Sequence, residues 1–109
     1  MDFDKLWDQI FHAATHETFN ASTVPQNRRT PLWFKVYTKN EYLYVDNTSD
    51  KSPSVKLSGA RRITKDDFLK VAAYYERWRN GEIHLRQEVR EQSMNTAYIF
   101  GLISKFSNS

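Results

Sequence analysis

Basic and aromatic side chains of the kinds that contact nucleic acid recur through the middle of this sequence. Cations attract phosphates and planar rings stack on bases. Arg61 and Arg62 directly precede a predicted helix, whose free N–H groups and positive dipole end also attract anions. The sequence therefore predicts a surface that binds nucleic acid or another anion, with these candidate residues: Lys35, Tyr37, Tyr42, Arg61, Arg62, Arg86 and Arg90.

The same residues also have an interpretation that needs no ligand. The arginines would then pair with Asp66, Asp67 or Glu82, and the tyrosines would pack in a core with their hydroxyls at its edge. The net charge is only +3, which is low for a dedicated nucleic-acid binder and favours this alternative. The basic residues concentrate between residues 51 and 90. Whether their side chains share one surface of the folded protein distinguishes the two interpretations.

The remaining residues give no pattern of catalysis or metal binding. His12 and His16 have the four-residue spacing of a metal pair on one helix face, but a third ligand is missing nearby. Glu17 lies outside the pair, so it does not occupy the general-base position of the zinc-protease motif. No glycine frames a serine in the way that the nucleophile elbow of one class of hydrolases requires. We therefore expect a binding module without catalytic residues, metal or cofactor.

Composition bounds the kind of protein. The 109 residues suit a single domain, residues 1–109, and a 15% share of aromatic residues indicates that the chain folds. Cysteine is absent, which excludes disulfides and thiolate metal sites and fits a reducing compartment. No apolar run approaches the about 20 residues that a membrane span needs, and acidic residues follow Met1. The expected location is the cytoplasm, without membrane contact.

The first half of the chain predicts a helix and a hairpin. Apolar residues at helical spacing predict a helix over residues 2–19, ending near Phe19, and the polar stretch that follows reads as a loop. Two runs rich in β-branched and aromatic residues flank Lys39-Asn40, which predicts a hairpin turn there. Simple alternation places one set of side chains inward, Phe34, Val36, Leu43 and Val45, and the other outward, Trp33, Lys35, Tyr37, Tyr42 and Tyr44.

The second half predicts a further strand and two helices. Residues 54–58 form the third predicted strand. Thr64 followed by Asp67 approximates a capping box, and Asn80-Gly81 ends the helix that it starts. Residues 82–92 suit a short strand about as well as a loop that leads into a helix. Ser93 or Asn95 then caps a final helix.

The expected fold is α+β: an N-terminal helix, a small three-stranded antiparallel sheet, and two C-terminal helices packed on the sheet. An antiparallel sheet can keep one face in water, but the outward rings make exposure of this face unfavourable. We therefore expect either the first helix or a binding partner to cover it.

Two groups of residues in the second half carry a family resemblance: Arg62-Ile63-Thr64 with Asp67-Phe68 and Val71, and Asn95-x-x-Tyr98-Ile99 with Leu102-Ile103. Over roughly residues 32 to 106 the chain resembles small α+β modules of bacterial restriction-modification proteins and of mobile integron gene cassettes. For the restriction-modification relatives, the resemblance implies a DNA-contacting or accessory role. The cassette proteins imply self-associating domains without assigned activity. The chain lacks the acid cluster of a nuclease, so no activity is carried over.

Two functions follow as hypotheses. In the first, the protein is a non-enzymatic module that binds nucleic acid through the basic and aromatic residues. In the second, it is a homo-oligomer whose aromatic surface joins subunits and leaves a pocket for a small molecule or a protein partner. Binding led by phosphate should weaken steeply with salt, whereas an aromatic subunit contact should hardly respond.

Overall fold

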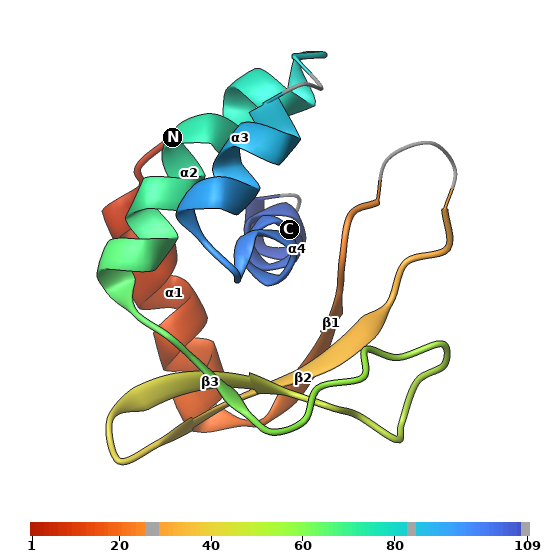
Figure 1. Ribbon diagram of the computed structural model, residues 1–109. Helices are drawn as coiled ribbons and strands as arrows, with labels where there is room; N and C mark the ends of the chain where they lie inside the picture. The colour runs from red at the N-terminus through yellow and green to blue at the C-terminus, as the bar shows by residue number, and fades with distance from the viewer. Residues whose placement is uncertain (26–28, 83–84, 108–109) are drawn as a thin grey trace.

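The chain folds into a layer of helices on one face of an antiparallel sheet (Figure 1). A computed structural model describes residues 1–25, 29–82 and 85–107, without the side chains of Arg86, Glu91 and Gln92. The α+β class and the leading helix are confirmed. In chain order the elements are α1 (Phe3–His16), β1 (Phe19–Ser22), β2 (Trp33–Lys39), β3 (Tyr42–Asp46), β4 (Arg61–Ile63), α2 (Lys65–Arg79), α3 (Leu85–Gln92) and α4 (Thr96–Ser107).

The sheet has four strands in the order β1-β2-β3-β4, and every neighbouring pair is antiparallel. The predicted hairpin joins β2 to β3, but its turn lies one residue later than expected. Lys39 pairs with Tyr42, so Asn40 and Glu41 form the turn, with φ angles of 52° and 68°. Positive φ at both central positions is what a tight two-residue hairpin requires, and Asn is among the residues that tolerate it best.

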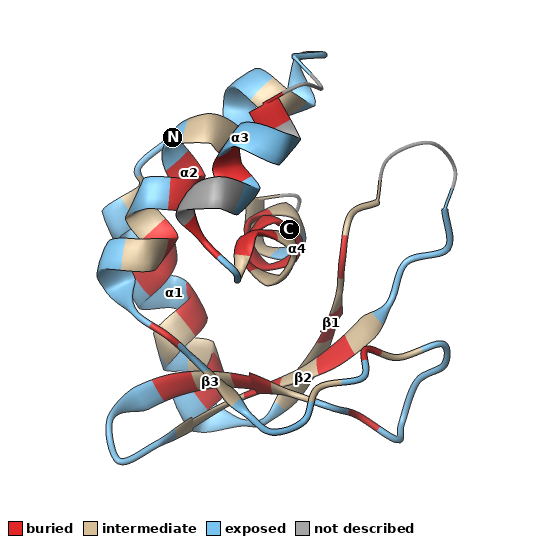
Figure 2. Cartoon of the chain, viewed as in Figure 1, coloured by how far each residue is buried: buried red, intermediate tan, exposed pale blue. Residues whose placement is uncertain are grey.

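The predicted alternation of the hairpin is confirmed. Phe34, Val36, Leu43 and Val45 are at most 1% exposed and face the helices. Their outward neighbours are only partly buried, apart from Tyr42, which is exposed. Because side chains alternate along a strand, this register fixes two faces of different chemistry. The inner face forms the core, and Figure 2 shows the buried residues gathered between the sheet and the helices.

Every described helix lies on the inner side of the sheet, where α4 packs on both α1 and α2 (Figure 1). Helix α1 packs on β2, α2 and α4, while α4 also packs on β1. Ile99, Phe100, Leu102 and Ile103 of α4 are fully buried, so this helix is apolar around most of its circumference. None of the helices in the described residues combines the length and the apolar character needed to cross a bilayer.

Helix α4 can approach β1 closely because Gly101 has no side chain. A Cβ atom built on Gly101 would lie 2.4 Å from the backbone carbonyl oxygen of Ser22. Such a distance is far below ordinary contact, and a backbone atom cannot move aside easily. The glycine therefore sets how near the central helix lies to the sheet edge.

The predicted ends of α2 are confirmed. The Thr64 hydroxyl accepts a hydrogen bond from the Asp67 backbone N–H at 3.1 Å, which caps the helix. At the other end Asn80 is the C-cap and Gly81 follows with a φ of 103°. The predicted apolar stripe is buried: Phe68, Val71, Ala72 and Tyr75.

The prediction that the first helix reaches Phe19 is wrong. Helix α1 ends at His16, because the chain is already extended at Glu17 and then enters β1. The polar stretch that was expected to be a loop thus begins as a strand, in which Phe19 pairs with Val36. Asn, Ala and Ser have little intrinsic tendency to form strands. Pairing with β2, far away in the sequence, holds these residues extended.

The predicted third strand at residues 54–58 is also wrong. That segment forms only an isolated bridge between Ser54 and Trp33, and the side chain of Asn47 binds both backbone groups of Leu57, at 2.7 and 2.8 Å. The strand that pairs with β3 is Arg61–Ile63, for which the sequence had predicted only a position in front of a helix. Val55 is nevertheless buried, so the apolar pattern identified a core residue without identifying its structure.

The ambiguous region from residue 82 to residue 92 contains a helix, α3, so three helices follow the sheet where two were expected. Leu85 and Val89 are buried four residues apart, which is the spacing of one helix face. Two residues that are four positions apart also lie on the same face of a strand, so this spacing alone does not distinguish a helix from a strand. Ile83 lies outside the described residues.

Candidate nucleic-acid interface

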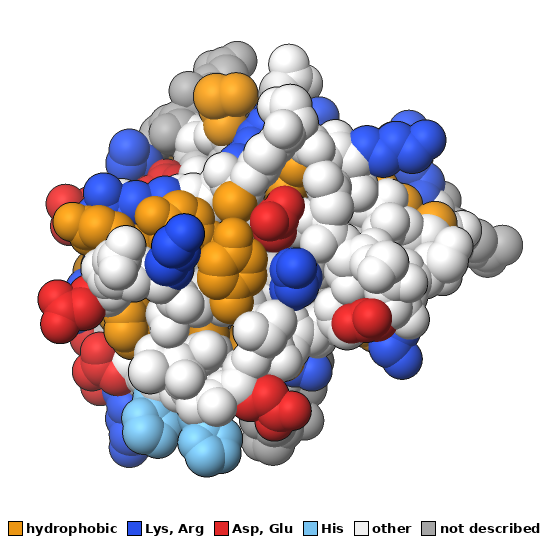
Figure 3. Space-filling view, turned by 90° about the horizontal axis from the view of Figure 1, so that it is seen from below, with side chains coloured by type: hydrophobic (Ala, Val, Ile, Leu, Met, Phe, Trp, Pro, Cys, Tyr) orange, Lys and Arg blue, Asp and Glu red, His pale blue; other side chains and the backbone are white. Residues whose placement is uncertain are grey.

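The outer face of the sheet carries most of the predicted binding residues, and no described helix covers it. Figure 3 views the molecule from below, the side of this face, and shows hydrophobic side chains gathered with Lys and Arg side chains among them. The expectation that the first helix might cover the rings is wrong, since α1 packs on the inner side. We call this surface the outer face and define it by Trp33, Lys35, Tyr37, Lys39, Tyr42, Tyr44 and Arg62.

The centre of the outer face is a pair of stacked tyrosines. Tyr37 and Tyr44 are opposite each other in β2 and β3, with ring centroids 5.6 Å apart and planes 22° from parallel. The ammonium nitrogen of Lys35 lies 5.7 Å from the centroid of the Tyr37 ring. Both rings are partly buried, so their positions are fixed by the sheet. The pair therefore presents a preformed aromatic platform with a cation beside it.

Two further rings on this face also carry a cation. The guanidinium carbon of Arg62 lies 3.7 Å from the centroid of the Tyr42 ring, which is a stacked contact. The ammonium nitrogen of Lys51 lies 5.3 Å from the centroid of the Trp33 ring. An arginine stacked on a ring keeps its N–H edges free, so it can still bind a phosphate oxygen. Among the described residues, the rings of Trp33, Tyr37 and Tyr42 thus each have a cation beside them.

One hydroxyl of the platform is engaged with an acid. The Tyr37 hydroxyl donates a hydrogen bond to Asp46 at 3.4 Å. Burial of the ring and the nearby negative charge of Asp46 raise the pKa of Tyr37. The hydroxyl therefore stays protonated at neutral pH and keeps donating to Asp46, which orients the ring.

Arg61 and Arg62 project to opposite sides of the sheet, because they are consecutive residues of β4. Arg62 pairs across the strands with Tyr44 on the outer face, and Arg61 pairs with Val45 on the inner side. The guanidinium of Arg61 donates to the backbone carbonyl of Met94 at 3.0 Å. The two side chains therefore leave the strand on opposite sides, although both border one hollow beside Met94 and Asn95.

The start of α2 is also occupied by its own acids. Asp66 and Asp67 lie in the first turn, and Asp67 accepts a hydrogen bond from Asn95 at 3.0 Å. These carboxylates offset the attraction of the helix dipole for another anion. The arginines do not neutralise them. Among the described residues neither Arg61 nor Arg62 forms an ion pair, and Glu82, the third expected partner, pairs with Arg77 at 3.0 Å and raises its pKa.

A groove between β4 and the turn that joins α3 to α4 is lined by both Arg61 and Arg90. One hollow of about 230 Å³ lies along Arg61 and Arg62, and a second of about 320 Å³ lies along Arg61 and Arg90. Met94, which is 80% exposed, lines both. We call these adjoining hollows the β4 groove, lined by Arg61, Arg62, Arg90, Ser93, Met94, Asn95, Thr96 and Ala97. The side chain of Arg86, a further candidate, lies outside the described part of the chain.

Sequence reasoning left four members of this arrangement out of the candidate set, and one of them, Lys39, belongs to the predicted hairpin turn. Trp33 and Tyr44 were placed on the outer face by alternation, and their ring chemistry could have identified them as contacts. Lys51 had no such signal, because the irregular segment that brings it over Trp33 has no periodicity. The candidate residues Lys35, Tyr37, Tyr42 and Arg62 do come together on the outer face, whereas Arg61 and Arg90 lie in the β4 groove.

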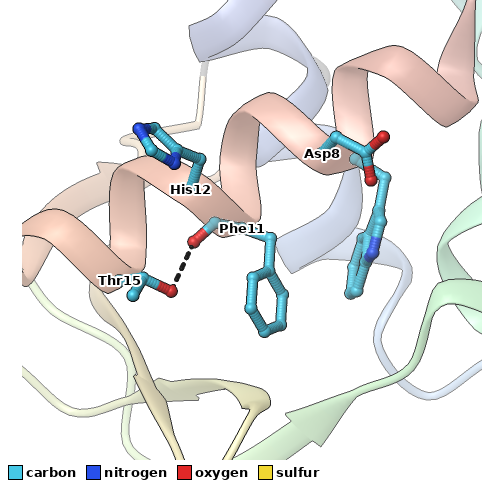
Figure 4. Close-up of a pocket in the computed structure, with 5 residues that line it drawn as sticks. Asp8, Phe11, His12 and Thr15 are labelled. Carbon is cyan, nitrogen blue, oxygen red and sulfur yellow. Dashed lines mark hydrogen bonds between the residues drawn. The ribbon is translucent and has the colours of Figure 1, made fainter.

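A further hollow lies elsewhere, along α1 (Figure 4). It measures about 430 Å³ and is lined by residues of α1 alone, including Phe11, Thr15 and His12. The Thr15 hydroxyl donates to the Phe11 carbonyl at 2.9 Å and contacts the Thr38 hydroxyl at 3.1 Å. In Figure 4 the Phe11 ring points to one side of the helix, while Asp8 and His12 lie on the other.

The α1 hollow is therefore not a reaction centre, because its polar groups do not converge on a common point. His16 is exposed on the same helix, and no group of three His, Asp or Glu side chains in the described residues could hold a metal ion. The outer face likewise offers rings and cations rather than a nucleophile beside a base.

No protein-family model, no curated protein and no solved structure matches this chain. The resemblance to restriction-modification and cassette modules therefore stays a prediction, and the function follows from the residues of this chain alone.

Proposed function

We propose that the protein is a non-enzymatic module that binds single-stranded nucleic acid on the outer face of its sheet. The observation that carries this proposal is the row of rings with cations beside them, which no described element covers. Tyr37 and Tyr44 stack in the middle of the face, and Arg62 stacks on Tyr42 beside them. Aromatic residues and cations on one exposed sheet are what base stacking and phosphate attraction together require.

A single strand fits this face better than a duplex does. Bases in a duplex are stacked on one another and present only their edges in the grooves, whereas unpaired bases can lay their faces on protein rings. The outer face has no protruding helix that could enter a major groove (Figure 1). The rings of Tyr37 and Tyr44 are held by the pairing of β2 with β3, so this pair is preorganised to accept a base.

The charges of the face support the same ligand. Lys35, Lys51 and Arg62 each lie against a ring, and Lys39 sits at the end of the hairpin. Asp46 is the acid beside the stacked tyrosines, where it receives the Tyr37 hydroxyl. Cations placed next to rings bring phosphates close to the platform on which the bases would stack. Positive charge and aromatic surface therefore act on one strand together.

The proposal is tested by titrating the protein into a fluorescent oligothymidine and following anisotropy. We expect binding that weakens by roughly tenfold or more between about 50 and 200 mM salt, as a few phosphate contacts require. The duplex of the same length should bind more weakly, because its bases are not free to stack. Absence of binding to the single strand at low salt would refute the proposal.

A second candidate function is self-association through the same face, as a homo-oligomer that binds a small molecule or a protein partner. The uncovered rings favour it, since exposed aromatic patches often mark protein contacts. A two-fold contact, however, would set the face against a copy of itself and bring Lys35 and Arg62 near other cations. Light scattering at several concentrations separates the two candidates, because a mass that stays monomeric would remove this one.

A further inference from the structure

The β4 groove begins where the outer face ends. Tyr37, Tyr44 and Arg62 stand opposite one another in β2, β3 and β4, so they form a row that crosses the strands. Strand β4 is the last of the sheet order, and the row therefore ends at its edge. Arg62 belongs to both surfaces, because it also lines the first hollow of the groove.

The groove continues around this edge toward the helices. Arg61 lines both of its hollows, and Arg90 of α3 lines the second one. No Asp or Glu of the described residues lines either hollow. Arg90 is exposed and forms no ion pair within the described part of the chain. The arginines of this edge therefore lie where a diffusible anion can reach them.

The position of Arg61 is fixed by two contacts. Its guanidinium donates to the Met94 carbonyl and lies 5.9 Å from the centroid of the Tyr98 ring. One hydrogen bond uses a fraction of the five N–H donors of an arginine, so others remain for a ligand. Arg61 is thus preorganised, and the exposed Arg90 lines the same hollow of about 320 Å³. Planar guanidinium groups suit phosphate oxygens.

We propose that the β4 groove holds backbone phosphates of the same strand whose bases stack on the outer face. The strand then crosses the sheet along the row Tyr37, Tyr44 and Arg62, turns over the edge of β4, and is held by Arg61 and Arg90. This inference rests on the proposed function, and it adds the path of the nucleic-acid strand and the part of the strand that each surface binds. Rings bind bases on the face, and arginines bind phosphates beyond it.

The test is the salt dependence of oligothymidine binding by the Arg90→Ala variant, with strands of about 12 nucleotides, long enough to span both surfaces. Each phosphate contact to a single strand contributes about 0.7 to the slope of log affinity against log salt. We expect the variant to lose about 0.7 of this slope and to bind about fivefold more weakly at 0.1 M salt. Arg90→Lys should retain most of the slope, because it keeps the charge.

The matched control is Arg79→Ala, which removes the same side chain and charge from the end of α2, away from the sheet (Figure 1). It should leave the slope unchanged. If the wild-type protein binds and Arg90→Ala behaves like this control, the path through the groove is wrong while the proposed function stands. If the wild-type protein does not bind the strand at low salt, both proposals fail.

Discussion

Replacing Tyr44 by alanine should weaken the binding of a single strand by about 1–3 kcal/mol, the usual contribution of one ring on which a base stacks. Tyr44 is the centre of the outer face, with the Tyr37 ring stacked beside it and Arg62 opposite it in β4. Its removal takes away one platform ring and the neighbour that holds the other. An anisotropy titration at fixed low salt measures the loss.

The matched control is Tyr44→Phe, which keeps the ring and removes only the hydroxyl. We expect it to bind like the wild type, and a thermal melt of both variants shows whether the sheet is intact at the temperature of the titration. Equal affinity for the alanine and phenylalanine variants would mean that the ring of Tyr44 does not contact the ligand.

Replacing Phe68 by alanine should lower the free energy of unfolding by about 3–5 kcal/mol, which is the largest effect we expect on stability. Phe68 of α2 is fully buried, and its ring centroid lies 5.3 Å from that of Trp7 in α1. Truncation removes apolar burial and leaves a cavity between α1 and α2. The close-packed residues around the cavity relax only in part, so most of it stays unfilled. Urea denaturation measures the change, as a lower midpoint with an unaltered slope.

Lys70→Ala on the same helix serves as the control. Lys70 is exposed, so we expect a change within about 0.5 kcal/mol. A loss below about 1 kcal/mol for Phe68→Ala would contradict the packing of α2 on α1 described above.

The sequence predicts the elements whose stabilising contacts are local. The caps of α2 at Thr64 and Asn80 use hydrogen bonds between residues a few positions apart, so the pattern marks both ends. Alternation along β2 and β3 likewise separates Val36 from Tyr37 without knowledge of the rest of the fold.

The sequence does not predict the elements that depend on distant partners. Strand β1 exists because Phe19 pairs with Val36, and nothing within its four residues indicates a strand. Strand β4 has only three residues, and it forms because Leu43 pairs with Ile63. Short strands of this kind gain their stability from the sheet they join, so their own composition carries little information.

The error at β4 also determines what was mistaken about the candidate site. The prediction that Arg61 and Arg62 act together at the start of a helix assigned them no strand, whereas a strand sends consecutive side chains to opposite faces. Arg62 consequently joins the rings of the outer face, and Arg61 joins Arg90 beside the helices. Only the three-dimensional structure brings residues 61 and 90 together.

The claim that the outer face of the sheet binds single-stranded nucleic acid is tested most directly by NMR. A titration of the ¹⁵N-labelled protein with oligothymidine reports every backbone amide at once, so the contacted surface is read without choosing a variant. We expect the largest shifts in β2, β3 and β4, around Tyr37, Tyr44 and Arg62, with few in α1. Shifts confined to the helices, or none at low salt, would contradict the claim.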